Sequence, residues 1–113
     1  MSQVTTHVLD TSLGKPAEGI SVLLEKPGPK GRWLAFAKGV TNKDGRVTDL
    51  LKKDRMLKPG NYRLTFDSAS YFNKNSKKHF YPLVQIVFEI KDDNHYHVPL
   101  LMSPFGYSTY RGS

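Results

Sequence analysis

The chain has 113 residues, of which 38% are hydrophobic and 24% charged, a balance typical of one globular domain rather than of a disordered segment. It contains no cysteine, which excludes disulfides, thiol catalysis and thiolate metal sites. Its net charge of +7 comes from dispersed lysines and arginines. We interpret this charge as a mildly positive field that aids solubility and attracts anionic small molecules, and we expect no nucleic-acid partner.

The start of the chain, "MSQVTTHVLD", carries neither a basic segment nor an apolar segment, which predicts that there is no signal peptide. No stretch of the chain approaches 18 consecutive apolar residues, so we expect no membrane-spanning segment and no membrane partner. From these missing signals, the expected location is the cytoplasm.

The first half of the chain alternates apolar and polar residues, which is the two-residue period of half-buried strands. Three strands are expected here, at residues 4–10, 20–26 and 32–40. In the first of them, Val4 and Val8 point to one face and His7 points to the other. A turn is predicted at Asp44-Gly45, because this dipeptide favours turn conformations.

The second half repeats this pattern around one interruption. Four further strands are expected, at residues 61–67, 81–90, 95–102 and 106–113. Residues 68–78 follow a capping residue and lack β-branched side chains, which predicts a short helix, whereas residues 50–60 form a loop or a helical turn. Seven or eight short strands with a turn about every ten residues indicate a single all-β domain over residues 1–113, a sandwich or a barrel.

Three of the four histidines lie in expected strands. His95 and His97 are two residues apart and therefore share a face, and His7 lies in the first strand. His79 lies in a basic loop, where we expect it to be solvated. Two imidazoles without a third ligand at suitable spacing are a weak metal signal, so no metal site is predicted.

The same residue types could carry out hydrolysis without a metal. Such a reaction needs a base to activate water, a cation for developing negative charge and an acid for the leaving group. The candidates are His7, His97, Arg46 or Arg111, and Ser113. Histidine suits the acid and base roles because its ordinary pKa is roughly 6.5. The pattern alone leaves open a histidine-assisted hydrolase and a small-molecule binding protein.

Four stretches of the chain together resemble a known family. They are "THVLDTSLGKPA", "TNKDGRV", "FYPLVQIVFEI" and the final "HYHVPLLMSPFGYSTYRGS". In this order and spacing the chain is similar to the 5-hydroxyisourate hydrolases, the transthyretin-like enzymes of urate breakdown, from residue 6 to residue 113. The closing Tyr-Arg-Gly-Ser is the most specific of these motifs.

The resemblance implies a prealbumin (transthyretin-like) β-sandwich of two four-stranded sheets with one short helix. It also implies a homotetramer, built as a dimer of dimers, with active sites at the interface between the dimers. The implied reaction hydrolyses an amide bond in the ring of 5-hydroxyisourate and yields 2-oxo-4-hydroxy-4-carboxy-5-ureidoimidazoline. The resemblance implies neither a cofactor nor a metal.

The motif positions also imply site residues. Those expected to be catalytic are His7, Arg46, His97 and Ser113. Those expected to bind the substrate are His7, Arg46, Tyr110, Arg111 and Gly112. In the Tyr-His-Val-Pro motif, His97 rather than His95 matches the family position. Which histidine is the base and which is the acid stays open.

Two further expectations concern the end of the chain. Strand alternation places Arg111 and Ser113 on one face, and Gly112 is expected to let the backbone pass close to a ligand. Structural roles at a subunit interface remain an equal explanation for Tyr110 and Gly112. The main alternative function is that of a transthyretin-like carrier, which binds a small ligand in the equivalent channel without chemistry.

Overall fold

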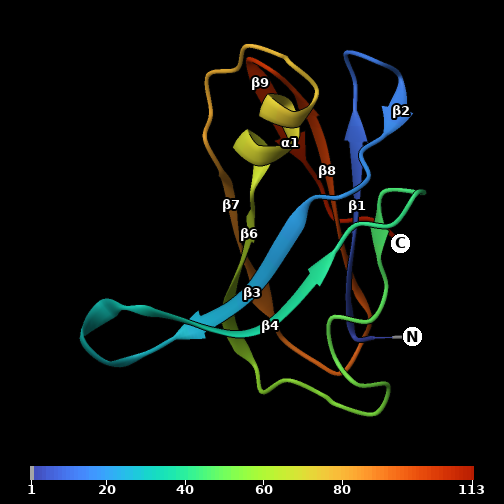
Figure 1. The fold of residues 1–113 in the computed structure, drawn as a ribbon. Helices are drawn as coiled ribbons and strands as arrows, with labels where there is room; N and C mark the ends of the chain where they lie inside the picture. The colour runs from blue at the N-terminus through green and yellow to red at the C-terminus, as the bar shows by residue number, and fades with distance from the viewer. Residues whose placement is uncertain (1) are drawn as a thin grey trace.

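The computed structural model describes residues 2–113 as two facing β-sheets with one short α-helix at one end of the sandwich (Figure 1). One sheet has the strand order β2-β1-β8-β9, with β5 also paired to β1. The other has the order β4-β3-β6-β7. The predicted all-β sandwich with one short helix is therefore confirmed, except that the first sheet has five strands and not four.

The bounds of the elements follow the expected segments closely. They are β1 (Val4–Asp10), β2 (Lys15–Pro16), β3 (Ser21–Pro27), the 3-10 helix η1 (Pro29–Gly31), β4 (Trp33–Val40), β5 (Arg46–Val47), β6 (Gly60–Phe66), α1 (Ser68–Lys74), β7 (Val84–Ile90), β8 (Tyr96–Ser103) and β9 (Gly106–Thr109). The differences are short: α1 ends at Lys74, β7 starts at Val84, and β9 stops at Thr109 instead of running to the last residue.

Strand β1 organises the sheet that matters for the site. It pairs in parallel with β8 on one side and antiparallel with β2 and β5 on the other. Strands β2 and β5 have two residues each and lie outside the segments where strands were expected. A two-residue strand is too short to show an alternating pattern, which explains why the sequence did not predict the fifth strand.

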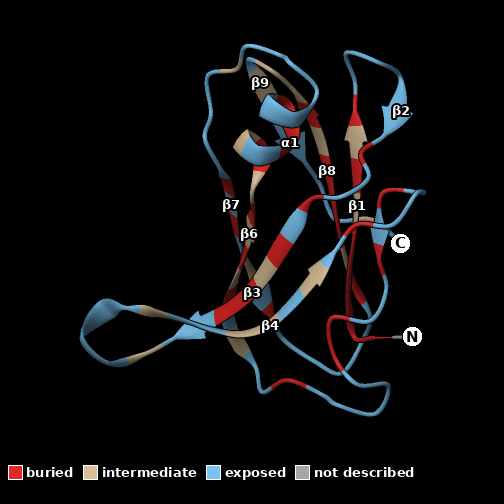
Figure 2. Cartoon of the chain, viewed as in Figure 1, coloured by how far each residue is buried: buried red, intermediate tan, exposed pale blue. Residues whose placement is uncertain are grey.

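The hydrophobic core lies between the two sheets, and buried residues alternate with more exposed ones along their strands (Figure 2). Val4 and Val8 of β1 have no exposed surface, and neither do Leu64 and Phe66 of β6. Burial of a large apolar side chain stabilises the fold by about 1.5–3 kcal/mol. The alternation in β1 therefore holds Val4 and Val8 in the core and directs His7 to the opposite face of the sheet.

Helix α1 is attached to β1 by a buried hydrogen bond. Its N-cap Asp67 accepts a hydrogen bond from the Ser70 backbone at 3.1 Å, which satisfies one free N–H at the start of the helix. Tyr71 donates its hydroxyl proton to the Asp10 carboxylate at 2.8 Å. Burial, helped by this carboxylate, raises the pKa of Tyr71 to about 12, so the hydroxyl stays a donor. Within residues 2–113, no helix has the length and apolar character needed to cross a membrane.

Candidate functional site

The register of three neighbouring strands brings the candidate side chains together. His7 on β1 pairs with Arg46 on β5, and Thr5 on β1 pairs with His97 on β8. On the far side of β8, Gly112 forms an isolated bridge with His97. Neighbouring strands lie about 4.8 Å apart, so these residues form one continuous surface. Residues that are separated by up to 105 positions in the chain thus become neighbours only through the sheet.

This surface contains a hollow of about 260 Å³ on the face of the sheet that points away from the core. Among the side chains that line it are those of Thr5, Arg46, Thr48, His95, His97 and Ser113. His7 lies beside the hollow, opposite Arg46 in the sheet. Of the groups that the sequence indicated for hydrolysis, the hollow therefore contains His97, Arg46 and Ser113, with His95 as a second imidazole, whereas His7 is not among the residues that line it.

The surroundings of the two candidate histidines favour their neutral forms. Burial lowers the pKa of His97, and the nearby Arg46, His95 and His7 lower it further. Burial and Arg46 likewise lower the pKa of His7, although a hydrogen bond with the Asp44 backbone acts in the opposite direction. A neutral imidazole can accept a proton, so both rings are suited to act as a general base near neutral pH.

Arg46 provides a positive charge that the described part of the chain does not neutralise. It is exposed, and no salt bridge to it forms within residues 2–113, where the ion pair present joins Arg63 to Glu25. A guanidinium stays charged at all relevant pH values and matches the two oxygens of a carboxylate-like group. The hollow is therefore suited to an anionic molecule or to negative charge that develops during a reaction.

Gly112 is held against His97 and leaves room for its ring. The Gly112 N–H donates a hydrogen bond to the His97 carbonyl at 2.9 Å. A Cβ atom at position 112 would lie 2.6 Å from His97 Cδ2 and 3.1 Å from Pro99 Cγ. The first distance is shorter than carbon–carbon contacts allow, and the second is tighter than most of them. The glycine thus has a steric role toward a candidate catalytic side chain, which the expectation of a close approach to a ligand did not include.

The other residues of the closing tetrad border two different hollows, both of which His97 also lines. The Arg111 guanidinium lies 4.4 Å from the centre of the Tyr96 ring and borders a different hollow, of about 290 Å³, together with Tyr110. Ser113 borders the hollow that contains His97. The expected strand ends earlier, since β9 stops at Thr109, and the expectation that Arg111 and Ser113 share a face stays a prediction.

Two residues of the site, Thr5 and His95, were not identified as catalytic or substrate-binding from the sequence. The Thr5 hydroxyl oxygen lies 2.8 Å from Nε2 of His95 and 2.7 Å from Nδ1 of His97. The two rings are stacked, with centres 6.1 Å apart, which confirms that His95 and His97 share a face. Threonine is common in strands, so Thr5 carried no signal until the parallel pairing of β1 and β8 placed it between the two rings.

The fourth histidine differs from the expectation. His79 is half-buried, and its ring stacks on Phe72 with centres 5.7 Å apart, so the prediction that it is simply solvated is wrong. Phe72 is almost fully buried, and the imidazole covers the remaining part of it. Across the described residues, no three or more histidine, cysteine or acidic side chains are grouped closely enough to hold a metal ion.

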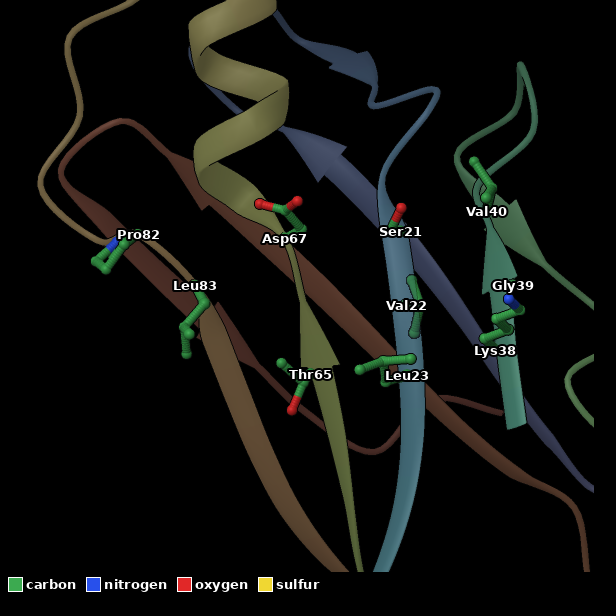
Figure 3. A pocket seen from close by; sticks show the side chains of 10 residues that line it. All are labelled: Ser21, Val22, Leu23, Lys38, Gly39, Val40, Thr65, Asp67, Pro82 and Leu83. Atoms are coloured by element: carbon green, nitrogen blue, oxygen red, sulfur yellow. The ribbon is translucent and has the colours of Figure 1, made fainter. Parts of the chain in front are cut away.

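A larger hollow, of about 660 Å³, lies on the other sheet (Figure 3). Leu83 and Pro82 stand on one side of it and Lys38 and Val40 on the other, as the close-up shows. Its one carboxylate is Asp67, which already caps α1. No histidine or arginine lines this hollow, and its carboxylate is already engaged at the start of the helix, so size alone does not identify the functional site.

Comparison with known proteins points to one family. A family model described as "HIUase/Transthyretin family" matches residues 4–112. A 5-hydroxyisourate hydrolase of Mus musculus is 45% identical over 114 residues, which cover 99% of this chain and 96% of that protein.

Two solved structures have the same fold. The 5-hydroxyisourate hydrolase of Klebsiella pneumoniae has a TM-score of 0.80 at 38% identity, covering 97% of this chain and 92% of that one. Sea bream transthyretin in complex with thyroxine has a TM-score of 0.90 at 27% identity, covering 98% of this chain and 95% of that one. The fold is thus shared with a hydrolase and with a transthyretin that was solved with thyroxine, and the hydrolase is the closer of these two in sequence.

Proposed function

Since the chain belongs to the HIUase/Transthyretin family, we propose that it is a hydrolase of urate catabolism that opens the ring of 5-hydroxyisourate. The product is 2-oxo-4-hydroxy-4-carboxy-5-ureidoimidazoline. One observation carries this proposal: the site holds two histidines in surroundings that keep them neutral, next to an arginine without an acidic partner in residues 2–113. These are the groups that activate water and stabilise negative charge.

The reaction begins with water. A neutral histidine, His7 or His97, accepts a proton as the water oxygen attacks the ring carbonyl carbon. The C–N bond of the ring amide then breaks, and the other histidine donates a proton to the departing nitrogen. The proton that was taken from water passes to this second histidine, so both rings end the step neutral. Ser113, which borders the same hollow, orients the water or passes on a proton. No cofactor or metal takes part in this scheme.

Arg46 binds the oxygen atoms of the substrate and stabilises the charge that builds up on them in the transition state. Its position opposite His7 supports this role, because the guanidinium and the imidazole then contact the same molecule. Gly112 supports binding by leaving space for the His97 ring. Tyr110 and Arg111 border the neighbouring hollow and contribute to substrate binding from there.

We further propose a cytoplasmic homotetramer, a dimer of dimers with active sites between the dimers. Strands β7 and β9 are the outer strands of their sheets on the same side of the sandwich, and their free backbone groups suit strand pairing with another copy. Large apolar side chains are exposed along these strands and near them, among them Val87, Tyr107 and Tyr110. A mass measurement in solution that gives a monomer contradicts this part of the proposal.

A non-enzymatic carrier is the alternative, since the sea bream structure with thyroxine has the same fold. Simple binding does not require two histidines with lowered pKa values beside a free arginine. The higher identity to the mouse enzyme also favours the hydrolase.

The deciding experiment generates 5-hydroxyisourate from urate with a urate oxidase and follows the decay of its ultraviolet absorbance. We expect the wild type to accelerate the decay, and His97→Ala to lose most of the acceleration. His79→Ala is the matched control, because it removes an imidazole that packs on Phe72 outside the site. A wild type that does not exceed spontaneous decay refutes the hydrolase and favours the carrier.

A further inference from the structure

The feature that the proposed scheme leaves unexplained is the hydroxyl of Thr5. The Thr5 side chain is 3% exposed, and its single oxygen lies between two histidine nitrogens. The distances are 2.7 Å to Nδ1 of His97 and 2.8 Å to Nε2 of His95, both within the range of good hydrogen bonds. A hydroxyl has one proton to donate and two lone pairs to accept with. It can therefore accept from one ring while it donates to the other.

We propose that Thr5 and His95 form a proton relay for His97. The relay has two states. In one, Nδ1–H of His97 donates to Thr5, and the Thr5 hydroxyl donates to Nε2 of His95. In the other, Nε2–H of His95 donates to Thr5, and the Thr5 hydroxyl donates to Nδ1 of His97. This inference rests on the proposed function, in which His97 transfers protons to or from the substrate or water.

The relay preserves protons and charge. When Nε2 of His97 accepts a proton from water, its Nδ1 proton moves to the Thr5 oxygen, and the proton of Thr5 moves to Nε2 of His95. His97 is again neutral, and the positive charge lies on His95. When His97 protonates the leaving nitrogen instead, the same three transfers run in reverse. His95 is exposed, so it can exchange its proton with solvent, whereas His97 is half-buried.

The surrounding charges give the relay a purpose. Arg46 on β5, His7 on β1 and His95 on β8 all disfavour a positive charge on His97. The Arg111 guanidinium, close to the His95 carbonyl, adds a further positive group next to β8. A proton on His97 is therefore held poorly, and a path that removes it through Thr5 lets the ring act as a base repeatedly. Thr5 and His95 act through His97 and are positioning residues in this sense.

The kinetic test uses three variants. Thr5→Val keeps the branched shape and removes the hydroxyl, Thr5→Ser keeps the hydroxyl, and His95→Gln keeps a hydrogen-bonding amide that cannot carry the proton. We expect kcat to fall about tenfold to a hundredfold in Thr5→Val and His95→Gln, with KM within about twofold of wild type. Thr5→Ser should be close to wild type. Full kcat in Thr5→Val or in His95→Gln overturns the relay.

A nuclear magnetic resonance measurement tests the relay without substrate. The ¹⁵N shifts of the imidazoles distinguish the tautomers of a neutral ring. In both states of the relay the two rings carry their proton on the same-named nitrogen, Nδ1 or Nε2. We expect this matched pair in wild type and in Thr5→Ser and its loss in Thr5→Val. A Nδ1–H on His97 together with Nε2–H on His95 overturns the relay. Wild-type protein without activity refutes the hydrolase, and the tautomers still decide the hydrogen-bond arrangement.

Discussion

Replacing Gly112 with alanine tests whether the position of the His97 ring controls activity. The new Cβ would lie 2.6 Å from His97 Cδ2, whereas carbon atoms pack at about 3.5–4.0 Å, so the ring must move by roughly 1 Å. A displacement of this size at a reacting group can reduce the rate by about a hundredfold. We expect kcat to fall between tenfold and a hundredfold. The free energy of unfolding should fall by only about 1 kcal/mol, because the site is open enough for the ring to shift.

The assay pairs two measurements, turnover of 5-hydroxyisourate and urea unfolding. Gly106→Ala is the matched control, because its Cβ would meet nothing closer than Ser103 Oγ at 3.9 Å. The control should keep its activity within about twofold of wild type. If Gly112→Ala is equally active, the steric argument is wrong. If it instead loses several kcal/mol of stability, Gly112 supports the fold and not the ring.

Three further predictions concern the helix, the histidines and the arginine. Tyr71→Phe should lower the free energy of unfolding by about 1–2 kcal/mol with turnover unchanged, because it removes a donor from a buried carboxylate; unaltered urea unfolding contradicts this. The pKa values of His7 and His97 lie below the ordinary 6.5, so both rings are mainly neutral at pH 6.5. The rate of hydrolysis should therefore decline only below that pH, as the base becomes protonated. A rate that stays constant down to about pH 5 counts against a histidine base. Arg46→Lys should reduce kcat/KM by about a hundredfold, because an ammonium group lacks the planar pair of N–H donors that a guanidinium offers. The control Arg32→Lys, on the exposed hairpin, should leave kcat/KM unchanged. Equal kcat/KM values for the two variants refute the role of Arg46.

Local sequence patterns are enough to predict most of the strands and their two faces. The alternation that places Val4 and Val8 in the core and His7 on the opposite face is local, because successive side chains of a strand point to opposite sides whatever the strand pairs with. The helix after Asp67 follows from a local cap in the same way. The motifs around His7, Arg46 and His97 were sufficient to identify the family.

How these segments meet could not be predicted from local patterns. The two-residue strands β2 and β5 exist because β1 offers them a partner, and no local pattern announces them. The parallel register of β1 with β8 places Thr5 against His97, across 92 positions of the chain. The Arg111 guanidinium lies over the Tyr96 ring, a contact that no local pattern predicts. Pairing and register depend on contacts between distant segments, and these contacts built the hydroxyl bridge between two histidines.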